Sequence, residues 1–75
     1  MTEKYQYKGR DLTTLVLAKV EHVVSIIAGR EEMAFDDAYL MFIQSTAFKN
    51  LTNLDTLTWS ESAEYIADDY YRERA

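Results

Sequence analysis

The sequence predicts a small all-α domain of three helices, at residues 12–28, 35–48 and 61–74, preceded by a mobile or loosely docked N-terminal arm at 1–10. Three observations predict this fold class. Apolar residues recur at three- and four-residue spacing over several turns, good capping residues stand at the segment ends, and polar residues typical of loops separate the segments. A chain of 75 residues is one domain, so residues 11–75 are assigned to a single helical domain.

The first helix begins after Asp11, whose carboxylate can accept hydrogen bonds from the backbone N–H groups of the next turn. Gly29 is the natural C′ residue, because glycine readily takes the left-handed conformation that closes a helix. At about 100° per residue, the apolar side chains cover an arc of roughly 200°, twice the stripe of an ordinary surface helix. The β-branched residues make a strand the competing interpretation for 20–27, but the sustained spacing favours a helix.

The second helix, at 35–48, follows a connection in which Met33 is expected to pack as a hydrophobic anchor. Asp36 and Asp37 lie in its first turn, where the helix dipole favours negative charge. Apolar residues surround most of its circumference, and a helix that is apolar nearly all round is buried nearly all round. The segment is therefore expected to be the central element of the bundle or to lie in an interface.

The third helix follows a polar loop and a short stretch with apolar anchors, in which Thr56–Trp59 is alternatively an extended strand. Ser60 or Ser62 is expected to cap the helix. Asp68 and Arg72 have the i,i+4 spacing of a helical ion pair. The narrow apolar face of this helix predicts one buried stripe, made of Ala63, Ile66, Ala67 and Tyr70.

The first two helices carry more apolar surface than a monomer of this size can easily hide. A core this small rarely supplies more than about 3–5 kcal/mol, so such chains usually depend on disulfides, metals or oligomerisation. The chain has no cysteine and one histidine, which excludes disulfides and argues against structural zinc. A homodimer or larger assembly is therefore predicted, with Trp59 and Tyr70 in the core. The candidate interface residues are Leu15, Val16, Val23, Ile27, Leu40, Met41, Phe48 and Tyr71.

The residues that carry chemistry in enzymes do not form a recognisable set here. His22 is the single histidine, and its sequence neighbour Glu21 points elsewhere on a helix, so a surface position is expected. The carboxylate doublets at 36–37 and 68–69 point about 100° apart on a helix, so neither forms a chelate unaided. No catalytic residue, metal site or cofactor is predicted.

The charge distribution argues against nucleic acid as a partner. The net charge is −5, and residues 1–10 carry +2 of their own. The remaining body is therefore acidic, whereas binding to phosphates needs clustered Lys and Arg. The alternative is that the cations of the arm touch nucleic acid beside Tyr5 and Tyr7. No apolar run reaches the roughly 18 residues of a membrane span, and the N-terminus lacks the apolar region of a signal peptide, so a cytoplasmic location is expected.

Two stretches of the sequence carry a resemblance to a known group of proteins. F-I-Q-S-T-A-F-K-N-L at 42–51 is followed by L-T-W-S-E-S-A-E-Y-I at 57–66. Over about residues 35–70 this resembles a family of short uncharacterised bacterial helical proteins. The resemblance implies a small helical domain with an accessory or antitoxin-like role, in toxin–antitoxin or mobile-element gene neighbourhoods, and no catalytic residues. Ala63 stands where family members often have proline, so the cap at Ser62 is less sharply defined.

These observations predict a non-catalytic protein-interaction or assembly module, whose partners are further copies of itself and another protein such as a cognate toxin. The alternative is an antitoxin-like regulator that touches DNA through residues 1–10. A small enzyme or metal-binding protein is the third and least favoured class.

Overall fold

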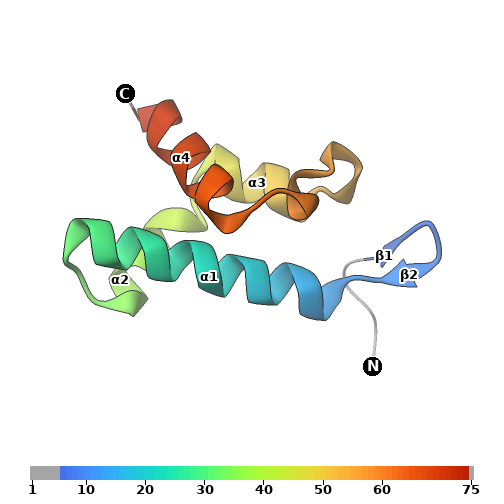
Figure 1. The fold of residues 1–75 in the computed structure, drawn as a ribbon, viewed down its shortest axis with the longest axis horizontal. Helices are drawn as coiled ribbons and strands as arrows, with labels where there is room; N and C mark the ends of the chain where they lie inside the picture. The colour runs from blue at the N-terminus through green and yellow to red at the C-terminus, as the bar shows by residue number, and fades with distance from the viewer. Residues whose placement is uncertain (1–5, 75) are drawn as a thin grey trace.

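The computed structural model describes residues 6–74, and within them the chain is all-α, as the sequence predicts. Four α-helices and two short 3-10 helices follow a minimal β-hairpin (Figure 1). In chain order the elements are β1 (Gln6–Tyr7), β2 (Arg10–Asp11), α1 (Thr13–Glu31), α2 (Phe35–Phe42), α3 (Thr46–Thr52), η1 (Leu54–Thr56), η2 (Thr58–Ser60) and α4 (Ala63–Arg74).

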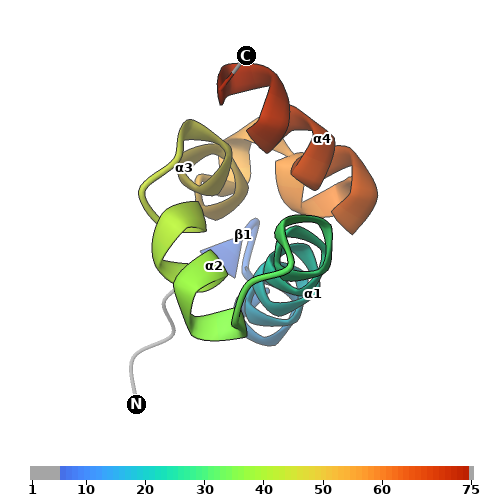
Figure 2. The ribbon, with the colours of Figure 1, turned by 90° about the vertical axis from the view of Figure 1, so that its left-hand side faces the viewer.

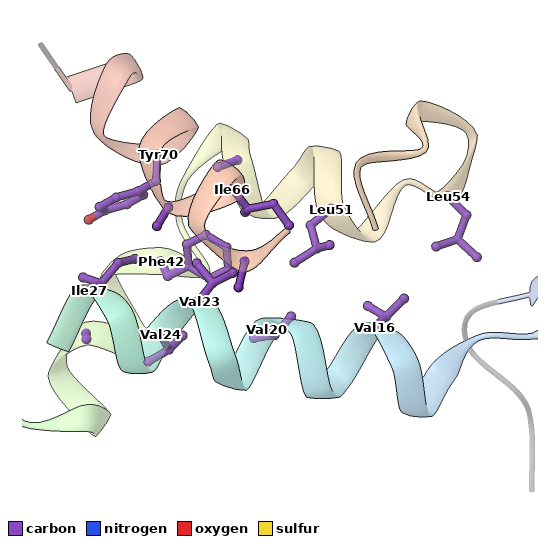
Figure 3. Packing of buried hydrophobic residues seen from close by; sticks show 14 of the residues in the cluster. Val16, Val20, Val23, Val24, Ile27, Phe42, Leu51, Leu54, Ile66 and Tyr70 are labelled. Carbon is purple, nitrogen blue, oxygen red and sulfur yellow. The ribbon is translucent and has the colours of Figure 1, made fainter. Parts of the chain in front are cut away.

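Helix α1 is the long element on which the others pack. α3 and α4 lie across one side of it, and α2 runs beside its C-terminal half (Figures 1 and 2). Its buried stripe repeats every three or four residues, so the competing strand interpretation for 20–27 is wrong. The stripe faces the apolar sides of α3 and α4 across a continuous core (Figure 3). The core contains Val16, Val20, Val23, Val24, Ile27, Phe42, Leu51, Ile66 and Tyr70.

The two ends of α1 differ from the prediction by one to three residues. The helix begins at Thr13, and its N-cap residue is Leu12, so the predicted N-cap at Asp11 is one residue too early. The Asp11 carboxylate still accepts a hydrogen bond from Thr13 N–H, at 2.9 Å. Hydrogen bonds from Thr13 hold the pKa of Asp11 below its usual value. At the other end Gly29 lies inside the helix, and Glu32 takes the left-handed conformation instead, with φ 53°. Met33 packs against the core, as expected.

The segment predicted as one helix at 35–48 is two helices, so the domain has four α-helices within 6–74 rather than three. Ser45 separates α2 from α3 in an extended conformation. Its buried hydroxyl donates to the Phe42 carbonyl at 2.6 Å and accepts from Phe48 N–H at 3.1 Å. A hydroxyl that bonds locally to the backbone competes with helical hydrogen bonds, so one side chain ends α2 and caps α3.

Between α3 and α4 the chain forms η1 and η2, so the alternative strand at Thr56–Trp59 is wrong. Ser62 caps α4, accepting from Tyr65 N–H at 3.0 Å. The predicted stripe of α4 is buried in full. The predicted ion pair between Asp68 and Arg72 does not form, because each finds another partner: Arg30 contacts Asp68 at 3.1 Å and Arg72 contacts Asp69 at 3.3 Å.

Part of the predicted N-terminal arm forms a β-hairpin. Residues 6–11 form a hairpin whose two-residue turn, Lys8–Gly9, has positive φ at both positions. This is the backbone of the turns that favour antiparallel pairing of twisted strands. Tyr7 packs edge-on against Trp59, with 5.6 Å between the ring centroids. The hairpin is therefore docked on the domain, and the remainder of the predicted arm, 1–5, lies outside the described residues.

Candidate interaction surface

Helix α2 carries large apolar side chains, outside its buried stripe, that the domain leaves partly exposed. Ala38 and Phe42 are its buried residues. At about 100° per residue, Leu40 lies about 180° from the direction midway between them, so it points directly away from the core. Leu40 is 54% exposed, Phe35 40% and Tyr39 41%. We call these three residues, with the half-buried Ile43, the α2 outer face.

This concentration of exposed apolar residues is not repeated elsewhere in residues 6–74. Three of the seven large exposed apolar side chains fall within 35–40. Leu15 and Leu17 lie two residues apart on α1, and therefore about 200° apart around it, on opposite flanks of its buried stripe. The other two exposed residues are Leu57 and Tyr65. Within residues 6–74, the α2 outer face is thus the place where the exposed large apolar side chains lie closest together in the sequence.

The eight residues predicted for an interface fall into three groups. Val16, Val23 and Ile27 have no exposed surface, because α3 and α4 cover that side of α1, so they cannot contact a partner of the folded chain. Leu15 and Leu40 are exposed. The half-buried group consists of Met41, Phe48 and Tyr71.

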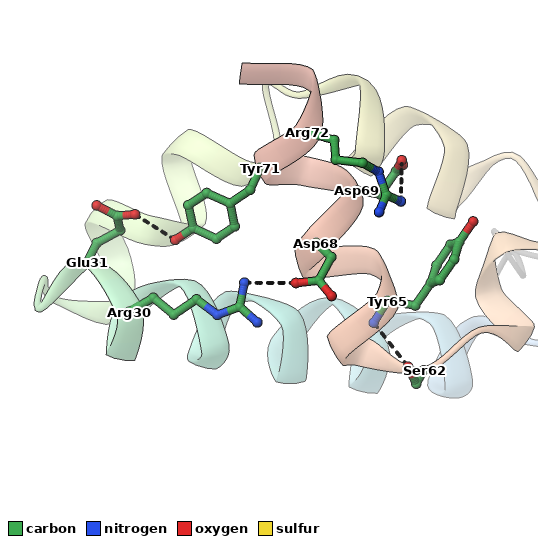
Figure 4. Close-up of polar contacts among 8 residues, drawn as sticks. All are labelled: Arg30, Glu31, Ser62, Tyr65, Asp68, Asp69, Tyr71 and Arg72. Atoms are coloured by element: carbon green, nitrogen blue, oxygen red, sulfur yellow. Dashed lines mark hydrogen bonds and ion pairs between the residues drawn. The ribbon is translucent and has the colours of Figure 1, made fainter. Parts of the chain in front are cut away.

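Two of the half-buried residues make well-defined contacts inside the chain. Phe48 packs edge-on against Phe42, with 5.7 Å between ring centroids. Tyr71 donates its hydroxyl to Glu31 at 2.7 Å, and the Arg30 guanidinium lies 5.3 Å from its ring centroid (Figure 4). Burial and the hydrogen bond to Glu31 raise the pKa of Tyr71 to about 12. Together with the Arg30–Asp68 ion pair, Tyr71 joins α4 to the end of α1.

The surroundings of the α2 outer face are acidic. Residues 31–48 contain four carboxylates and no lysine or arginine. Glu31 accepts the Tyr71 hydroxyl, whereas Glu32, Asp36 and Asp37 are exposed and form no ion pair with any residue of 6–74. Asp36 and Asp37 occupy the first turn of α2, as the sequence predicts, where they also compensate the helix dipole.

Helix α4 also makes a polar contact with α3 that the sequence analysis did not predict. The Glu73 carboxylate accepts from two backbone N–H groups at the start of α3, those of Thr46 at 3.0 Å and Ala47 at 2.8 Å. The sequence contains no local pattern that indicates this contact, because the bonded groups lie more than twenty residues apart and only the tertiary fold brings them together. This contact holds the C-terminal end of α4 on the start of α3.

The side chains that could hold a metal ion do not cluster in the part of the chain that the structure describes. His22 is exposed on α1. No group of three or more His, Cys, Asp or Glu residues within 6–74 is placed to hold a metal ion. None of the helices within the same residues has the length and apolar character needed to cross a membrane.

The cations of the predicted nucleic-acid alternative are only partly described. Lys8 and Arg10 are exposed on the hairpin, and the Lys8 ammonium lies 5.3 Å from the centroid of the Tyr7 ring. Lys4 and Tyr5 lie outside the described residues. Contact with nucleic acid through residues 1–10 therefore stays a prediction from sequence.

Comparison of the chain with protein-family models, with curated proteins and with solved structures finds no significant match. The resemblance to short bacterial proteins therefore stays a prediction from sequence.

Proposed function

We propose that the chain is a non-catalytic protein-interaction module and that the α2 outer face is its contact surface. The observation that carries the proposal is Leu40, a large apolar side chain that points away from the core and is 54% exposed. Phe35 and Tyr39 extend the same surface along the helix. Contiguous exposed apolar surface of this kind marks sites where proteins meet, whereas apolar residues scattered singly are ordinary.

This surface revises the interface expected from sequence. The valine and isoleucine side chains of α1 serve the core, so the proposed contact is confined to α2 and its flanks. An antitoxin-like role, which the sequence resemblance implies, would be one instance of this function, since such a protein acts by covering its toxin.

The test compares two leucine-to-serine variants with similar starting exposure. Leu40→Ser removes the leucine of the α2 outer face. Leu57→Ser is the control: Leu57 is 45% exposed and lies between η1 and η2. The turn between η1 and η2 is at the end of the molecule opposite to α2 (Figure 1). Tagged full-length chains are purified from source cells, and associated proteins are quantified by mass spectrometry. Light scattering of the pure chains measures self-association.

We expect Leu40→Ser to lose a partner, or to lose self-association, that Leu57→Ser retains. Both variants keep the helical circular dichroism of the parent, because neither residue is part of the core. Equal association by the parent chain and both variants would contradict the proposal.

A further inference from the structure

We infer that the partner of the α2 outer face is a cationic amphipathic helix, with lysine or arginine flanking its apolar stripe. This inference rests on the proposed function and adds the chemistry of the partner. It starts from two properties of the same surface: an apolar ridge on α2, and a border that carries negative charge without compensating cations.

The shape of the surface favours a helix as the occupant. Phe35, Tyr39 and Ile43 follow one another at four-residue spacing, and Leu40 lies beside them. Such a row is the ridge that packs into the grooves of a facing helix. Peptides that bind in this way present apolar anchors at i, i+3, i+4 and i+7. From Phe35 to Ile43 the ridge is about 12 Å long, which matches about two turns of a partner helix.

The charge of the surface favours a cationic occupant. Glu32, Asp36 and Asp37 border the ridge, and none of them has an ion-pair partner within residues 6–74. The nearest cation in the sequence on the N-terminal side, Arg30, is engaged by Asp68. Lysine or arginine beside the partner's apolar stripe supplies the missing charge, and complementary charge at the rim of an interface speeds association and selects the partner.

The same charges disfavour a second copy of this chain as the occupant. In a two-fold pairing of α2 centred on Tyr39, each Asp36 lies about 4.5 Å from the centre along the helix axis. The two Asp36 residues are then about 9 Å apart along that axis, slightly more than the Debye length of about 8 Å at physiological salt, so their repulsion is weak there and becomes significant only at low salt. Asp37 adds a second like-charged pair, and no lysine or arginine from 31–48 separates them.

The experiment uses the full-length chain and three synthetic helical peptides of about 18 residues, long enough to be helical in isolation. All three share one leucine stripe, and the flanking positions are lysine, glutamine or glutamate. Binding is measured by titration calorimetry, and the contact is located by NMR shift changes. We expect the lysine peptide to bind at least about tenfold more tightly than the glutamine peptide in about 0.05 M salt. That advantage should shrink at about 0.5 M salt because the charges are exposed.

Two charge variants locate the effect. Asp36→Asn combined with Asp37→Asn should weaken the lysine peptide at least about fivefold and leave the glutamine peptide unchanged. The matched control, Glu61→Gln combined with Glu64→Gln, removes the same charge at the start of α4 and should leave both affinities unchanged. Shift changes should centre on Phe35, Tyr39 and Leu40.

Each other outcome counts against the inference and separates it from the proposed function. Equal binding of the lysine and glutamine peptides, lost in Leu40→Ser, supports the contact surface and overturns the cationic partner. If the pure chain self-associates and Leu40→Ser does not, the contact surface is again supported, but its occupant is a second copy of the chain and the inference of a cationic partner is overturned. A lysine advantage reduced equally by both charge variants would reflect net charge alone and overturn the inference. If no peptide binds and Leu40→Ser behaves as the parent, both proposals fail.

Discussion

Helices α1 and α2 both have apolar residues around much more than one face, yet the fold uses them differently. α1 packs against α2, α3 and α4, and five residues of its stripe are buried. α2 packs chiefly against α1 and buries only Ala38 and Phe42. The difference shows that the apolar arc of a helix does not fix how much of it is covered: the number of neighbouring elements does. The surplus on α2 is what makes its outer face a candidate contact surface.

The sharpest test of this contrast compares the two sides of α2. Phe42→Ala opens a cavity at a fully buried residue that meets Phe48 and Tyr70 edge-on, and should cost about 3–5 kcal/mol of unfolding free energy. Leu40→Ala should cost less than about 0.5 kcal/mol, because its side chain is exposed. Urea unfolding followed by circular dichroism measures both. A large loss for Leu40→Ala would mean that the outer face is already packed in the isolated protein.

The junction between α2 and α3 depends on Ser45. Ser45→Ala removes the acceptor for Phe48 N–H and a buried donor to the Phe42 carbonyl, so it should destabilise the domain by about 1–2 kcal/mol. Ser25→Ala, at an exposed position on α1, is the control and should change stability by less than about 0.5 kcal/mol. Similar losses in both variants would show that Ser45 does not define the break between the two helices.

The end of α1 offers a pair of stabilising changes. Gly29→Ala should add about 0.5–1 kcal/mol, because Gly29 is helical and an added methyl group meets nothing within 4 Å. Glu32→Gly should add about 1 kcal/mol by removing a side chain from a left-handed residue with φ 53°. Gly9→Ala, at φ 81°, should instead destabilise the hairpin. Thermal unfolding checks all three, and a destabilised Gly29→Ala would place the helix end at Gly29 after all.

The smallest expected effect concerns the contact between α1 and α4. The pKa of Tyr71 is raised to about 12 from 10.0, so the neutral phenol is favoured in the folded chain. The contact of the neutral Tyr71 phenol therefore stabilises the fold fully below about pH 10, which is the pKa of tyrosine in the unfolded chain. This stabilisation is lost as the pH rises through the folded-state pKa of about 12. Tyr71→Phe should flatten the fall in stability over this range. Identical pH profiles of the parent and the variant would contradict the contact with Glu31.

The sequence predicted those features of the fold that depend on local pattern. The buried stripes of α1 and α4 follow from the spacing of their apolar residues, and the cap at Ser62 from its place before the stripe. The end of α1 was misplaced because Gly29 is a favourable closing residue but not an obligatory one. The helix continues for two more residues to Glu31, and there Arg30 contacts Asp68 and Glu31 contacts Tyr71, two residues of α4 that lie far away in the sequence.

The exposure that an interface residue needs was predicted correctly for only some of the candidate residues. Leu40 was identified because α2 is apolar nearly all round, and it is exposed as an interface residue must be. Val16 was assigned to the same interface because a helical wheel shows where apolar residues gather, not which neighbour covers them. The helix break at Ser45 divided the predicted second helix, so α3 could fold back over α1 and bury that valine. Long-range packing of this kind is not encoded in the periodicity of one segment.

One measurement tests most directly whether the α2 outer face is a contact surface. A photo-crosslinking amino acid is placed at position 40 of the full-length chain, and at position 57 as the control, in source cells. We expect illumination to give a discrete adduct from position 40 that is absent from position 57. No adduct at position 40, or the same adducts from both positions, would contradict the account.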